Sequence, residues 1–175
     1  MRRWLTAVAL VVLALGAIYW LAIRDSSIAA KLEVPRATAT IGTGSDAVAV
    51  GSNGQVLAWL PLSEDLLLPY LPLSSVPKGG RLAGPVLEQA RVLGAAPATL
   101  RPYVERSYYG ESGVDVTLRS GIELRFGDAS QAAAKWKAAA AVLADPSITA
   151  LDYVDLHAPR RPAIGGSGHT LPAIE

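Results

Sequence analysis

The chain has 175 residues, 51% of them hydrophobic, and its mean hydropathy of +0.31 is high for a soluble domain of this size. The chain has 16 basic and 15 acidic residues. The basic residues form no cluster, which argues against a nucleic-acid-binding protein. Cysteine is absent, which excludes disulfides and thiolate metal sites, and histidine occurs only twice. We therefore expect no metal, no cofactor and no nucleic-acid partner.

The excess hydrophobicity belongs to the segment from Trp4 to Ile23, which contains no charged residue. Twenty helical residues span about 30 Å, the thickness of the hydrocarbon core of a membrane. Arg2 and Arg3 precede the segment, so the positive-inside rule places the N-terminus in the cytoplasm. Residues 1–23 are therefore predicted to form a cytoplasmic stub and one transmembrane helix. A signal peptide cleaved near Ser27-Ile28-Ala29 is the alternative, and it would also export the domain.

Residues 24–46 are small, polar and punctuated by glycine, which predicts a linker with one candidate strand at Arg36 to Ile41. The apolar runs Ala47–Val50 and Gln55–Trp59 then flank Gly51-Ser-Asn-Gly54. Asn-Gly between two apolar runs favours a β-hairpin, because both residues tolerate positive φ.

Leu60 to Pro77 is rich in leucine and proline, and its four prolines exclude a regular helix. We expect an extended crossing segment with buried leucines. Gly84-Pro85 then opens a short helix, because proline suits the first helical turn, and Gly94 fits just past its end.

Three strand candidates follow at Tyr103 to Tyr109, Val114 to Leu118 and Ile122 to Phe126. Their connections are short, which predicts antiparallel pairing. Apolar and polar residues alternate in the second and third candidates, as expected for a sheet with one covered face and one wet face.

A helix is predicted from Ala129 to Leu143, with Asp128 or Ser130 as its N-cap and Lys135 beside its buried stripe. That stripe consists of Ala132, Trp136, Ala139 and Leu143. A last strand runs from Leu151 to Leu156, and Gly165-Gly-Ser-Gly168 begins a frayed tail that includes His169. The predicted fold class is α+β: one N-terminal transmembrane helix, then an antiparallel β-meander sheet with two helices packed on it. The predicted extracytoplasmic β domain covers residues 47–165, and a flexible tail covers residues 166–175.

The candidate functional residues do not form a catalytic motif. His157 and His169 lack a nucleophile on a strand-to-helix turn, so we expect no catalytic residues. Tyr108 and Tyr109 could form a ligand platform, but adjacent strand residues face opposite sides of a sheet. The last strand is more informative: at a sheet edge it either accepts a partner strand or is an inert, capped edge.

The ordered set of strands and helix resembles the C-terminal β domain of the FtsQ/DivIB bacterial cell-division proteins. The similarity is carried by Val114-Asp-Val-Thr-Leu-Arg-Ser-Gly121, Ile122-Glu-Leu-Arg-Phe-Gly-Asp128, Lys135, Leu143 and Leu151-Asp-Tyr-Val-Asp-Leu156. Val50-Gly-Ser-Asn-Gly-Gln-Val56 is similar to the hairpin with which that domain begins, although Gly51 stands where the family has Asp.

The resemblance implies a non-enzymatic scaffold of the divisome in the bacterial plasma membrane, with FtsB/DivIC-like and FtsL-like partners and no small-molecule substrate. The family's POTRA domain is expected to be missing, because residues 24–46 are too few for it, and Glu33 to Ala39 resembles a remnant. By position the partner interface would be Tyr153, Val154, Asp155, Leu156, His157, Ala158, Pro159, Arg160, Arg161 and Pro162. A cell-envelope enzyme or ligand-binding domain, and a degenerate copy without a divisome role, are the alternatives.

Overall fold

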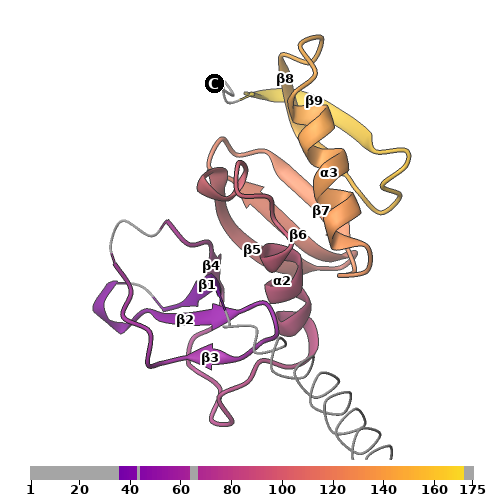
Figure 1. Ribbon diagram of the computed structural model, residues 1–175. Coiled ribbons are helices and arrows are strands. Elements are labelled where there is room, and N and C mark those ends of the chain that lie inside the picture. The colour runs from indigo at the N-terminus through magenta and orange to yellow at the C-terminus, as the bar shows by residue number, and fades with distance from the viewer. Residues whose placement is uncertain (1–35, 43, 64–66, 172–175) are drawn as a thin grey trace, which may run out of the picture. The chain divides into compact units, whose positions relative to one another are not determined.

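The computed structural model describes residues 36–42, 44–63 and 67–171 (Figure 1). The predicted membrane span from Trp4 to Ile23 lies outside these ranges, as do residues 172–175. Neither of the two helices in the described ranges is long and apolar enough to cross a membrane.

The described residues form an α+β fold in which one nine-stranded sheet has the order β3-β2-β1-β4-β5-β6-β7-β8-β9. Short 3₁₀ turns lie at Gly44–Asp46, between two strands, and at Arg101–Tyr103, between a helix and a strand. The strands and the two α-helices are β1 Ala37–Ile41, β2 Val48–Gly51, β3 Val56–Leu57, β4 Tyr70–Leu71, α2 Gly84–Gly94, β5 Val104–Gly110, β6 Gly113–Leu118, β7 Glu123–Gly127, α3 Ala132–Leu143, β8 Ala150–Asp155 and β9 Ala163–Thr170.

The sheet is mixed, so the expectation of a purely antiparallel meander is wrong. The short connections do give antiparallel pairs, both in the hairpin of β2 and β3 and in the run β5-β6-β7. The neighbours β1 and β4, β4 and β5, and β7 and β8 are parallel. In each of the last two pairs a helix connects the two strands: α2 follows β4, and α3 follows β7. The chain therefore crosses back along the helix before the next strand starts in the same direction.

The sheet also reaches further toward the N-terminus than the sequence predicted. The candidate strand in the linker is present as β1, which pairs with β2 on one side and β4 on the other. Residues Ala37–Ile41 therefore belong to the sheet rather than to a linker, and Ala39 and Ile41 contribute to its core.

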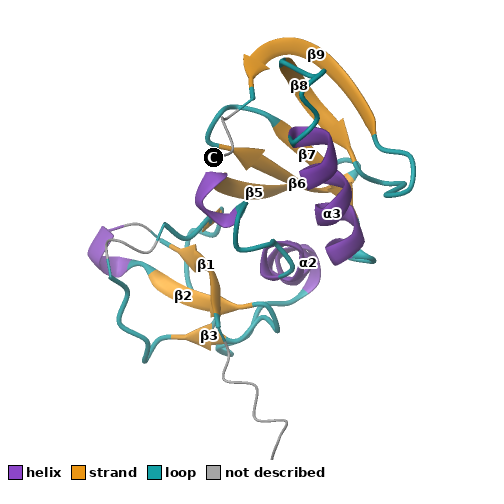
Figure 2. Ribbon diagram, turned by 45° about the horizontal axis from the view of Figure 1, so that its top comes forward, coloured by secondary structure: helices purple, strands orange, loops and turns teal. Residues whose placement is uncertain are grey.

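Both helices cover the same face of the sheet (Figure 2). The stripe predicted for α3 is buried, and Trp136 is 1% exposed at its centre. The indole Nε1 of Trp136 donates a hydrogen bond of 2.7 Å to the carbonyl oxygen of Val92 in α2, and its ring lies 5.0 Å from that of Phe126 in β7. Trp136 therefore joins α3, α2 and the sheet in a single core.

The start of α3 differs from the sequence prediction. Neither Asp128 nor Ser130 caps the helix, which begins after Gln131, a residue with a φ of +52° and no side-chain capping bond. Asp128 Oδ1 instead accepts hydrogen bonds from the backbone N–H of Ser130 and from Lys135 Nζ, at 3.1 and 2.7 Å. Lys135 is 2% exposed, and its Nζ also donates to the Phe126 carbonyl at 2.8 Å. Lys135 thus ties the first turn of α3 to the end of β7.

Candidate functional site

The strand predicted to offer a free edge is internal to the sheet. In β8, Val154 lies between Leu124 of β7 and Ile164 of β9, so strands flank it on both sides. Val154 and Leu156 are both 0% exposed. The expectation that this strand lies at the edge is therefore wrong, and these two side chains belong to the core.

The outer strand next to β8 is β9, in the segment for which the sequence predicted a frayed tail (Figure 1). Its glycines allow close contacts with β8: a Cβ added at Gly165 would lie 2.6 Å from the ring of Tyr153, and one at Gly166 would overlap the Asp152 carboxylate. Asp152 Oδ1 also accepts a hydrogen bond of 2.7 Å from the backbone N–H of Gly168. These glycines thus serve strand packing, a contact with residues distant in sequence that local composition does not reveal.

The backbone groups of Ile164 point away from β8. Leu156 N donates to Arg125 O of β7 at 2.8 Å, so the amide of Leu156 faces β7. Backbone direction alternates along a strand, so Tyr153 and Asp155 face β9 and pair there with Gly165 and Ala163. Ile164, between those two residues, directs its N–H and C=O outward, and its side chain is 45% exposed.

The loop that leads from β8 to β9 is fixed at its start by His157. His157 Nδ1 lies 2.8 Å from Asp155 Oδ1, and Nε2 lies 3.3 Å from the carbonyl oxygen of Ser112 in the β5–β6 turn. The ring covers Gly127, where a Cβ would lie 2.6 Å from His157 Cδ2. The hydrogen bond to Asp155 raises the pKa of His157. Burial alone raises the pKa of Asp155, but the bonds from His157 outweigh it and the pKa is lowered.

The rest of the predicted interface lies in the same loop. Ala158 O accepts from Arg161 N at 2.9 Å in a turn, while Pro159 and Arg160 lie against α3 and line a shallow groove with Lys137. Ala158, Arg160 and Arg161 are exposed. The structure therefore separates the ten predicted residues into a buried strand, which supports β9, and an exposed loop at the start of β9.

Polar side chains occupy the sheet face opposite the two helices. Arg125 forms an ion pair with Glu123 at 2.9 Å and lies over the Tyr153 ring, 4.0 Å from its centroid. Tyr108 donates its hydroxyl to Glu123. Asp115, 7% exposed, has an Oδ1 without a partner among the described residues, and burial raises the pKa of its carboxyl group.

Tyr108 and Tyr109 do not form a common ligand platform. The hydroxyl of Tyr108 is hydrogen-bonded to Glu123. Tyr109 lies opposite Val114 of β6 and is 46% exposed. His169, expected in a frayed tail, lies in β9 opposite Leu151 and packs on Gly121. The sequence analysis missed β9 itself, for which the apolar pair Ala163-Ile164 after Pro162 was the available signal.

The fold is thus an α+β domain with a mixed sheet that ends in an exposed strand. The family model described as cell division protein FtsQ/DivIB, C-terminal, matches residues 39–157, which is more than half of the chain. The chain therefore belongs to the FtsQ/DivIB family of cell-division proteins, as its sequence pattern indicated. This is a non-enzymatic family that is associated with the membrane at the septum. Comparison with curated proteins finds no matching relative.

Proposed function

We propose that this chain is a non-catalytic divisome scaffold that binds a partner strand along the outer edge of β9. In this proposal Trp4 to Ile23 anchors it as a single span in the bacterial plasma membrane, with its N-terminus in the cytoplasm. The β domain then lies outside the cytoplasm at the septum, where its partners are FtsB/DivIC-like and FtsL-like proteins. Family membership supports the role in cell division, and the geometry of β9 supports the mode of binding.

The observation that carries the proposal is the outward-facing backbone of Ile164. A terminal strand with free N–H and C=O groups can accept another strand, whose main-chain hydrogen bonds supply affinity. The exposed Ile164 side chain offers an apolar contact beside those bonds. The buried residues Val154 and Leu156 then act indirectly, because they fix β8, against which β9 is aligned.

Ile164→Pro tests this mode directly, because proline removes the outward N–H and leaves the pairs of Ala163 and Gly165 with β8 in place. The full-length chain in nanodiscs would be titrated with the extracytoplasmic segment of an FtsB/DivIC-like protein. Loss of one intermolecular hydrogen bond should weaken binding roughly tenfold. Ile164→Ala is the matched control: it loses the side chain but keeps the N–H, so it should weaken binding less.

Strand addition is excluded if Ile164→Pro keeps its folded circular dichroism spectrum and binds as tightly as the unaltered chain. A scaffold role also predicts that depletion of the protein produces filamentous cells. Normal division after depletion would instead favour a degenerate family member without a divisome role.

A further inference from the structure

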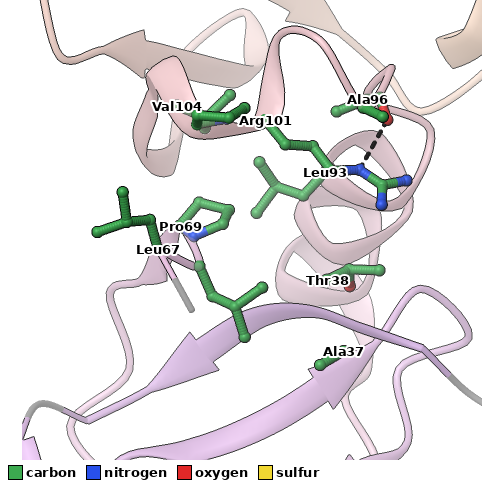
Figure 3. Close-up of a pocket in the computed structure, with 11 residues that line it drawn as sticks. Ala37, Thr38, Leu67, Pro69, Leu93, Ala96, Arg101 and Val104 are labelled. Carbon is green, nitrogen blue, oxygen red and sulfur yellow. Dashed lines mark hydrogen bonds between the residues drawn. The ribbon is translucent and has the colours of Figure 1, made fainter. Parts of the chain in front are cut away.

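A second feature of the fold is an apolar cavity of about 310 Å³ at the other half of the sheet, lined by the first residues of β1, the segment before β4, the end of α2 and the start of β5. Figure 3 shows Pro69 and Leu93 facing each other across it. Ala37 and Val104, the first residues of β1 and β5, lie on opposite sides of it in Figure 3. The cavity shares no residue with the β9 surface.

The cavity lies where the three parallel strands β1, β4 and β5 begin, before the positions at which they pair with one another. Pairing of β1 with β4 starts at Thr40 and Tyr70, and β4 pairs with β5 through Tyr70 and Arg106. Pro69 lies just before β4 and has no N–H to donate to a neighbouring strand. Its carbonyl oxygen accepts a hydrogen bond of 2.9 Å from the backbone N–H of Thr40.

Among the described residues that line this apolar cavity, one is charged: Arg101, from the turn before β5. Its Nε donates a hydrogen bond of 2.9 Å to the carbonyl oxygen of Ala96, which holds the side chain across the mouth next to Leu93 (Figure 3). The exposed Leu67 adds apolar surface at the rim. A guanidinium held in place binds a carboxylate at a lower cost in side-chain entropy than a freely rotating one.

We propose that this cavity is a docking site for an extended peptide segment of a protein partner, with a leucine-like side chain in the cavity and a carboxylate on Arg101. The volume lies at the lower end of the range for ligand sites, about 300–1,000 Å³, and so suits one or two apolar side chains. The charge of Arg101 selects an acidic neighbour over a basic one. This site goes beyond the β9 surface and stands independently of it.

The test uses two fluorescein-labelled peptides, acetyl-Ser-Leu-Leu-Glu-Ser-amide and the same peptide with Gln in place of Glu. Each would be titrated against the full-length chain in nanodiscs by fluorescence anisotropy. The Glu peptide should bind roughly tenfold more tightly than the Gln peptide, as expected for a charged hydrogen bond. Arg101→Gln should abolish this difference, Arg101→Lys should retain part of it, and Ala98→Trp at the exposed rim should block both peptides.

Equal binding of the two peptides, or an unchanged preference in Arg101→Gln, would overturn the proposal. A photo-crosslinker at Ala98 in dividing cells gives an independent result, expected to be a crosslink to a protein segment with an apolar residue beside an acidic one. Products formed only with lipid, or only with a second copy of the chain, would also overturn it. Because Ile164→Pro leaves this cavity intact, failure here and failure of the β9 proposal are distinguishable.

Discussion

The two halves of the sheet are held together in different ways. The strands β5 to β8 have five to seven residues each and share the core around Trp136. In the other half β3 and β4 have two residues each, and turn bonds such as Val56 N to Gly80 O and Leu82 N to Gly54 O supplement them. The long strands build the stable base for β9, whereas the short ones leave the cavity beside Arg101.

This comparison predicts its largest effect at Trp136. Trp136→Ala should lower the free energy of unfolding by about 3–5 kcal/mol, because it removes a buried ring and its bond to Val92. Urea unfolding of the full-length chain followed by circular dichroism measures this. Trp59→Ala is the control in the other half, since Trp59 is 64% exposed, and should change stability by at most about 0.5 kcal/mol. Equal losses in the two variants would contradict the assignment of the core.

The next effect is expected at Lys135. Lys135→Met should cost about 1–3 kcal/mol in the same assay, because it leaves the buried carbonyl of Phe126 without its hydrogen-bond donor. Lys137→Met is the matched control: Lys137 is exposed on the same helix. If both variants unfold at the same urea concentration as the unaltered chain, Lys135 does not hold α3 to β7.

The ion pair between Lys135 and Asp128 predicts that the stability of the fold depends on pH. Hydrogen bonds from Lys135, and then from Ser130, lower the pKa of Asp128 from 3.8 to about 2. A lowered folded-state pKa stabilises the fold fully above pH 3.8, and this contribution is lost as the pH falls toward 2. The stability difference between the unaltered chain and Asp128→Asn should therefore shrink across that range. In a Lys135→Met background only the bonds from Ser130 still lower the pKa of Asp128, so the difference should shrink less across the same range; a decline of undiminished size there would assign it to another group.

The smallest effect is expected at His157, which is exposed. Its pKa is raised by the hydrogen bond to Asp155, so its contribution is present below the unfolded value of 6.5 and is lost as the pH rises through the folded value. The protonated ring donates from both nitrogens, to Asp155 and to Ser112 O, whereas the neutral ring donates from one. Asp115, Lys135 and Arg125 are the other charged groups near this cluster.

Melting temperatures of the unaltered chain and of His157→Gln should differ more at pH 6 than at pH 9. The outcome that contradicts this assignment is a difference that grows with pH. Such a result would show that the neutral ring, rather than the charged one, stabilises the loop at the start of β9.

Local sequence patterns predicted the half of the fold in which neighbouring elements pair. Alternation in Val114 to Leu118 and the stripe around Trp136 defined β6 and α3, because the residues that contact each other are spaced regularly. The parallel pairs β4 with β5 and β7 with β8 were missed, since they depend on where a crossover helix returns the chain. Lys135 was placed beside the buried stripe, and its burial requires acceptors at the end of β7 that no helical pattern reveals.

The interface assigned by resemblance stays a prediction, and it adjoins the strand edge that we propose as the binding surface. The interface assigned by resemblance ends at Pro162, directly before the strand that forms the edge. The glycines of β9 suggested a tail because glycine weakens a strand in general. Their role depends on Tyr153 and Asp152, which occupy the space that side chains at Gly165, Gly166 and Gly168 would need.

Amide hydrogen exchange at Ile164 and Gly165 tests the central claim most directly. The N–H of Gly165 faces β8 and should be protected in the free chain, whereas that of Ile164 faces outward and should exchange fast. Saturation with the extracytoplasmic segment of an FtsB/DivIC-like protein should slow exchange at Ile164 by at least about tenfold. Unchanged exchange at Ile164 in the saturated complex would contradict strand addition at β9.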